Sequence, residues 1–244
     1  MPRKHAPASH NNLTPEQEQL RQALDENTEF PWQDDQILLI CTNPVPNHPA
    51  YGMSFSEYKK HRNDIISSDD KEKVRLSTRL PAFINRISAD MALHNGVSHY
   101  RFLVLVLELG MINFQRDYHE KYQVIKSGRD DMYKKLSTEK NRRLYEQLDK
   151  QYIDMEIIAR GAKHMTPTVA EWLANATNDI ATYLNMSISE FVVLCWCIGV
   201  SKSMDPEELP LQVNLEITKK LQYFDQEITF YSERIIDLVH RMDL

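Results

Sequence analysis

Basic and hydroxyl side chains recur at every second position of one short segment of the chain. Between positions 73 and 80 they alternate with apolar or β-branched residues, which is the period of a strand with one exposed face. The polar positions of this segment are Lys73, Arg75, Ser77 and Arg79. Arginine can donate two hydrogen bonds to guanine O6 and N7, and serine can pair with any base edge. The pattern therefore predicts contacts to DNA bases from Arg75, Ser77 and Arg79.

The same alternation has a second interpretation. Lysine and arginine on an exposed strand edge also prevent that strand from pairing with another chain. Both interpretations place the cations in solvent and turn the intervening set inward. That inward set is Val74, Leu76, Thr78 and Leu80. The pattern alone leaves the choice between DNA recognition and edge protection open.

The hydrophobic period changes to that of a helix after Pro81, which has no N–H to give to a strand ladder. The predicted helix ends at Asn95-Gly96, because glycine adopts the left-handed C-terminal conformation at little cost. Ser98 is a good cap for a second helix. Residues 102–114 of that helix are apolar on most sides, so we expect it to be buried.

A short strand, a helix, a glycine turn and a buried helix resemble the ribbon-helix-helix family of the Arc and MetJ repressors. The residues that carry the resemblance are Arg75–Pro81 and Asn95–Ser98, in a unit that covers about one fifth of the chain. The resemblance implies a two-stranded antiparallel ribbon that enters the major groove. It also implies that the start of the second helix binds a DNA phosphate. The phosphate contacts expected are Lys73 and the free N–H groups of Val97, Ser98 and His99.

The C-terminal half of the chain repeats this order in weaker form. Residues 157–166 take the place of the strand, residues 168–185 form a helix, and residues 191–200 form a buried helix. When the two sequence segments are aligned, Pro167 lies near the place of Pro81, Ile188-Ser189 matches Val97-Ser98, and Gly199 falls near Gly110. The second copy could contact DNA through Lys163, His164 and Ser189. One chain then supplies both strands of the ribbon, or each first copy pairs with its mate in a homodimer.

The predicted fold is mainly α with a short antiparallel β-ribbon, a duplicated ribbon-helix-helix with additional amphipathic helices. The predicted segments are an N-terminal extension (1–70) with a short helix and a Pro-rich loop, a first unit (71–116), a helical connector (117–156), a degenerate second unit (157–204) and a C-terminal amphipathic helix (205–244). The extension includes helices at 14–27 and 55–62, and residues 36–42 form a short buried strand or a peripheral segment. The connector helix begins near residues 129–131. Residues 211–217 form a strand or the start of the last helix.

The composition limits the remaining classes of function. A net charge of −6 argues against a protein that coats nucleic acid by bulk charge, although a local basic face is compatible with it. Met1–Leu24 lacks the apolar core of a signal peptide, and no apolar run reaches the roughly 18–20 residues that span a bilayer. The three cysteines, Cys41, Cys195 and Cys197, have no metal-ligand spacing. We expect a cytoplasmic, nucleoid-associated protein with no metal and no cofactor.

Two functions remain open at this point. The first is sequence-specific binding of double-stranded DNA, in a transcriptional regulator such as a repressor. The second is a structural or assembly module that uses the same fold for oligomerisation. Phosphate-binding glycine loops and the common hydrolase and metalloprotease motifs are absent from the sequence, so we expect no enzyme.

Overall fold

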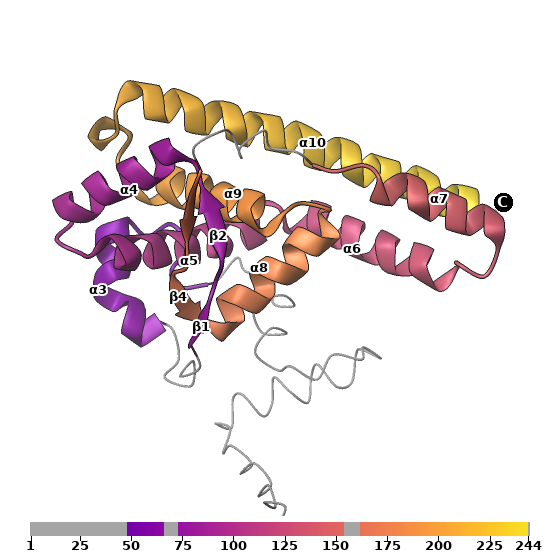
Figure 1. Ribbon diagram of the computed structural model, residues 1–244, viewed down its shortest axis with the longest axis horizontal. Helices are drawn as coiled ribbons and strands as arrows, with labels where there is room; N and C mark the ends of the chain where they lie inside the picture. The colour runs from indigo at the N-terminus through magenta and orange to yellow at the C-terminus, as the bar shows by residue number, and fades with distance from the viewer. Residues whose placement is uncertain (1–47, 66–72, 154–161, 244) are drawn as a thin grey trace, which may run out of the picture.

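The computed structural model describes residues 48–65, 73–153 and 162–243, which are mainly helical with four short strands (Figure 1). The strands are β1 (Lys73–Arg75), β2 (Thr78–Leu80), β3 (Lys163–Met165) and β4 (Thr168–Ala170). The helices are α3 (Phe55–Ile65), α4 (Ala82–His94), α5 (His99–Asp117), α6 (His119–Lys134), α7 (Glu139–Asp149), α8 (Glu171–Tyr183), α9 (Ile188–Ser203) and α10 (Leu211–Asp243), with a 3-10 turn η2 at Pro206–Glu208. The predicted class, mainly α with a short antiparallel β-ribbon, is confirmed.

The strands form one narrow ribbon from two distant parts of the chain. β1 pairs antiparallel with β4, and β2 pairs antiparallel with β3. The Leu76 N–H donates to the Pro167 carbonyl across 3.0 Å between these two ladders, so the register continues without a shift. Residues 73–80 therefore lie along residues 163–170, and one chain supplies both sides of the ribbon (Figure 1).

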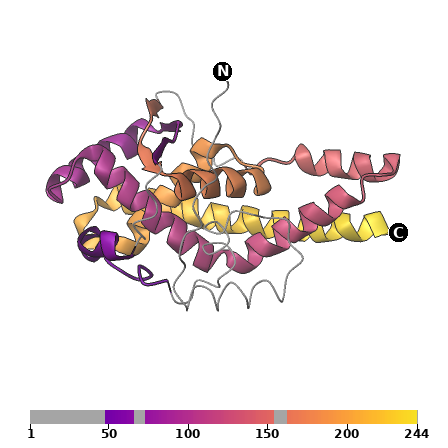
Figure 2. The same ribbon diagram turned by 90° about the horizontal axis from the view of Figure 1, so that it is seen from below.

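Helices α5 and α9 cross under the ribbon and form the centre of the core (Figure 2). Both are buried along most of their length, as predicted for residues 102–114 and 191–200. They approach closely because each has a glycine at the crossing, Gly110 in α5 and Gly199 in α9. α4 packs on α5, and the indole N–H of Trp196 in α9 donates to Ser88 of α4 across 2.9 Å.

Both central helices begin in the same way. Ser98 caps α5 by accepting a hydrogen bond from the Arg101 N–H, as its residue type predicts. Ser187 caps α9 in a capping box with Glu190. Each preceding turn has one residue with positive φ, Gly96 (φ 63°) and Asn185 (φ 53°), and these are residue types that adopt the left-handed conformation at low cost.

The connector and the last helix form an extension from this core. α10 runs along one side of the molecule, and α6 and α7 pack against its C-terminal half (Figures 1 and 2). Arg129 of α6 joins the three helices, since its guanidinium donates to Tyr231 across 2.7 Å and to Asp149 across 3.1 Å. On the opposite side of the core, α3 docks on α5 through the pair of half-buried Arg62 and fully buried Glu108.

Several predicted boundaries were wrong. The second strand lies at 163–170 instead of 157–166, and the helix after it starts at Glu171 instead of Thr168. Pro167 therefore lies inside the ribbon opposite Leu76, where its carbonyl accepts a hydrogen bond but its nitrogen has no N–H to return one, so the ladder is interrupted between the β1–β4 and β2–β3 pairs. The connector is two helices, because residues 135–138 form a turn before Thr138 caps α7. Residues 211–217 are helical from Leu211.

Other predictions lie outside the described residues. These are the tail and helix within 1–27, the strand at 36–42 with Cys41, and residues 157–161. Of the helices that the structure describes, none alone is both long and apolar enough to cross a membrane. The pairs α4–α5 and α8–α9 reach that length and composition only together, and they are bent by 103° and 110°.

Candidate nucleic-acid interface

The outer face of the ribbon carries the predicted base-contacting residues. Lys73, Arg75, Ser77 and Arg79 are exposed, and Leu76, Thr78 and Leu80 between them are buried. The opposite strand continues the outer face with His164, Thr166 and Thr168, and turns Met165 and Val169 inward. Lys163 pairs with Leu80 and therefore has the inward register, but it is exposed at the end of the ribbon. The predicted exposure of the first strand is therefore confirmed, whereas the contact to DNA stays a prediction for both strands.

Sequence reasoning missed Thr166 and Thr168 as members of this face. Thr168 was assigned to the following helix, because Val169, Trp172 and Leu173 fit a helical period. The signal that could have located the strand is the alternation of Met165, Pro167 and Val169 with polar residues. Proline at the middle position of this alternation is atypical of a strand, so the pattern was not recognised.

The ribbon is positively charged although the whole chain is negative. Neither strand segment, 73–80 or 163–170, contains an acidic residue. Among the described residues, no carboxylate pairs with Lys73, Arg75, Arg79 or Lys163. Lysines of the extension differ, since Lys121 and Lys135 each lie 2.6 Å from an aspartate oxygen. Within the described part of the chain, no acidic side chain therefore competes with an anionic partner for these cations.

Two hydrogen bonds hold the strands and the helix beneath them in place. The Ser77 hydroxyl and the His164 Nε2 atom are 2.9 Å apart across the outer face. The backbone N–H of Arg79 donates to the Ser189 hydroxyl of α9 across 2.9 Å. Ser189 therefore supports the ribbon from the side. The predicted match of Ser189 with Ser98 was also wrong, because Ser187 caps α9.

The start of α5 has part of the geometry that the predicted phosphate contacts require. The Val97 N–H donates to the Ala92 carbonyl across 3.0 Å, so the expectation that it is free was wrong. Its side chain packs on the core instead. Ser98 is exposed and His99 is half-buried, and the first amides of a helix have no partners within the helix. These free amides form the positive end of the helix dipole, where an anion is favoured.

His99 itself adds no positive charge at neutral pH. Burial lowers the pKa of His99 below its ordinary value of 6.5, and the positive charge of Lys163 lowers it further. Among the described residues, its Nε2 atom has no hydrogen-bond partner. A contact from His99 to phosphate would therefore use its backbone N–H, while Lys163 provides charge nearby.

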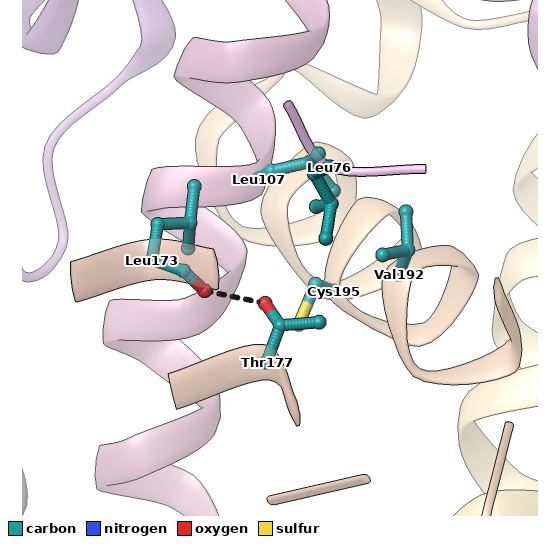
Figure 3. A pocket seen from close by; sticks show the side chains of 6 residues that line it. All are labelled: Leu76, Leu107, Leu173, Thr177, Val192 and Cys195. Carbon is teal, nitrogen blue, oxygen red and sulfur yellow. Dashed lines mark hydrogen bonds between the residues drawn. The ribbon is translucent and has the colours of Figure 1, made fainter. Parts of the chain in front are cut away.

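A small apolar gap lies beneath the ribbon, between α5, α8 and α9 (Figure 3). Its lining residues are Leu76, Leu107, Leu173, Thr177, Val192 and Cys195. The single hydroxyl among them, that of Thr177, already donates to the Leu173 carbonyl across 2.6 Å (Figure 3). This lining offers no unmatched polar group to a ligand, so the gap is explained by the packing of the core.

The described residues hold no cluster of three histidine, cysteine or acidic side chains that could bind a metal ion. Burial raises the pKa of the Cys197 thiol to about 12 and also raises that of Cys195, so both thiols are protonated at neutral pH. Comparison of the chain with protein-family models, curated proteins and solved structures finds no match.

Proposed function

We propose that this chain is a sequence-specific double-stranded DNA-binding protein of ribbon-helix-helix type that acts as a transcriptional regulator. The observation that carries the proposal is the outer face of the ribbon, on which Arg75, Ser77 and Arg79 project from a strand whose other side is buried. A two-stranded ribbon fits the major groove, and arginine there reads guanine.

The rigidity of the ribbon supports this proposal. An isolated two-stranded ribbon is only marginally stable in water, but here its inner face is buried on the core. The buried side chains of this inner face are Leu76, Thr78, Leu80, Met165 and Val169. The outer side chains are therefore presented from a fixed backbone. A preorganised strand loses less conformational entropy when it binds, which favours affinity.

A duplication of the unit is supported by constant spacing. The helix caps Ser98 and Ser187, the turn residues Gly96 and Asn185, and the crossing residues Gly110 and Gly199 are each separated by 89 residues (98 to 187, 96 to 185, 110 to 199). We propose that two ribbon-helix-helix units of one chain form the pair that two subunits form in a homodimer. Strand pairing within the chain then leaves the ribbon complete without a second copy.

The alternative function is an assembly module. The observation in its favour is the exposure of apolar side chains on α10, where Leu211, Phe230 and Ile236 are all more than half exposed. Such residues could contact a partner helix, and the net charge of −6 disfavours nonspecific DNA binding. This alternative gives no role to the ribbon cations, which have no carboxylate partner within the described residues.

Salt dependence of binding tests the proposal against this alternative. The purified chain is titrated into a labelled mixed-sequence duplex over a range of about 50 to 200 mM salt, because affinity falls with a slope of about −0.9 per phosphate contact. Replacing Lys73 by alanine should reduce the slope by about one unit. The matched control is Arg143→Ala, an exposed cation of α7 away from the ribbon (Figure 1). If the chain does not bind the duplex in a salt-dependent way but still associates with itself at all salt concentrations, the assembly module is favoured.

A further inference from the structure

We infer that one chain recognises an asymmetric DNA site, in which two guanines about four base pairs apart lie on the same DNA strand. This inference rests on the proposed function and adds the form of the target. It comes from a comparison of the two strands of the ribbon at equivalent positions. The spacing of 89 residues defines those positions.

The two strands present different side chains at every equivalent outer position. Arg75 corresponds to His164, and Arg79 corresponds to Thr168, while Ser77 and Thr166 keep a hydroxyl in both strands. In a homodimer both halves of the ribbon would carry the same residues, and the preferred site would be palindromic. Here both arginines are on the first strand, so the two halves of the ribbon read different bases.

The strand geometry sets the distance between the two guanines. Arg75 and Arg79 are four residues apart on one side of the ribbon, which is about 13 Å at 3.3 Å per residue. Base pairs are about 3.4 Å apart along the duplex, so this separation corresponds to about four base pairs. When the ribbon lies along the groove, side chains of one strand reach mainly the bases of the DNA strand on their side.

The first turns of α5 and α9, which flank the ribbon, also differ in charge, and the first copy is again the more suitable one for DNA. The first turn of α5 contains His99, Tyr100 and Arg101 and no acidic residue. The first turn of α9 contains Glu190, whose carboxylate accepts the Ser187 N–H in the capping box. A carboxylate at this place already occupies the positive end of the helix and repels a phosphate. The DNA backbone is therefore bound more strongly at the start of α5 than at the start of α9.

Selection of binding sites from random duplexes tests this inference in the full chain. We expect an enriched site without palindromic symmetry, bound by one chain as measured by sedimentation of the complex. Arg75→Ala and Arg79→Ala should each abolish the preference for one of the two guanines, a loss of about 5- to 150-fold in relative affinity for a bidentate contact. Each variant should leave the other guanine preferred.

A gain-of-function variant provides a sharper test in the same selection experiment. His164→Arg/Thr168→Arg places arginines on the second strand at the positions equivalent to Arg75 and Arg79, and both replaced side chains are exposed. We expect this variant to select additional guanines on the complementary strand, so that the enriched site becomes palindromic. A control duplex with only one of the two guanines moved to the complementary strand should bind the wild-type chain tenfold more weakly or worse, because the two guanines then no longer lie on the same DNA strand.

The outcomes separate the inference from the proposed function. A palindromic site bound by two wild-type chains would overturn the asymmetric site and leave DNA binding standing. An enriched asymmetric site that is unaffected by Arg75→Ala and Arg79→Ala would overturn the assignment of the guanines. If no sequence is enriched and binding does not depend on salt, both the inference and the proposed function fail.

Discussion

Gly110 of α5 and Gly199 of α9 face each other where the two helices cross. A Cβ atom added to Gly199 would lie 3.1 Å from the Gly110 nitrogen and 2.2 Å from the Val106 carbonyl oxygen. A Cβ atom added to Gly110 would lie 1.9 Å from the Cys195 carbonyl oxygen. Both encroached oxygens belong to backbone in the middle of a buried helix, so neither can move alone. The close approach of the two helices therefore depends on the two glycines.

Alanine at either crossing position should destabilise the fold. We expect Gly110→Ala and Gly199→Ala each to lower the free energy of unfolding in urea by about 1–3 kcal/mol, because the core must separate to admit the methyl group. Gly128→Ala is the control, since its Cβ would come within 2.2 Å of the Ile235 γ2 methyl group, a side-chain atom instead of backbone, and alanine favours the helix. Equal effects at Gly110 and Gly128 would contradict the crossing geometry.

The buried carboxylate of Glu108 should depend on Arg62. The Arg62 Nε atom lies 2.6 Å from Glu108, which is fully buried, and the Tyr58 hydroxyl donates to the same oxygen across 3.1 Å. Arg62→Met leaves that charge unpaired, so we expect a loss of about 3–5 kcal/mol in unfolding free energy. Arg62→Met/Glu108→Gln should recover much of the loss in the same denaturation experiment. A double variant no more stable than Arg62→Met would refute the pairing as the cause.

Ser189 distinguishes support of the ribbon from contact with DNA. Its hydroxyl accepts the Arg79 N–H, so Ser189→Ala should lower stability by about 0.5–1.5 kcal/mol. The salt slope of DNA binding should stay unchanged, because no phosphate contact is lost. Thermal unfolding and salt titration of the same variant measure both quantities. A reduced slope with unchanged stability would instead make Ser189 a phosphate contact.

The stability of the fold should decrease in mild acid. Burial lowers the pKa of His48 and His99 below their ordinary value of 6.5. The unfolded chain therefore binds these protons more tightly, so stability is lost as the pH falls below 6.5 and towards the lowered pKa values. Urea midpoints measured from pH 7.5 to pH 5 should fall, and His48→Gln/His99→Gln should flatten the decrease. An identical pH dependence in wild type and variant would exclude these two histidines as its source.

The sequence predicted those elements in which local and tertiary preferences agree. Lys73–Leu80 alternates cleanly, and Pro81, Gly96 and Ser98 each have one preferred backbone role, so the first unit was located to within a few residues. The resemblance to a ribbon-helix-helix protein came from the same residues. Periodicity also located α9 and most of α10, because their apolar residues are numerous and regularly spaced.

Tertiary contacts decided what the sequence could not predict. The segment around Pro167 forms a strand because residues 73–80 lie beside it, and its own alternation is short and contains a proline, so that pattern alone does not distinguish a strand from the start of the next helix. The occupied amide of Val97 depends on the way its helix turn closes on Ala92. Ser187 and Ser189 are both good caps by type, and only the register of α9 shows that Ser187 is the cap and Ser189 meets the ribbon.

The most direct test of DNA recognition by the ribbon is selection from a pool of random duplexes by the wild-type chain and by Arg75→Ala/Arg79→Ala. Both side chains are exposed, so the variant should keep the circular dichroism spectrum and urea midpoint of the wild type. We predict that the wild type enriches one sequence and that the folded variant enriches none. Enrichment of the same sequence by both proteins, or by neither, would contradict recognition of DNA bases by this ribbon.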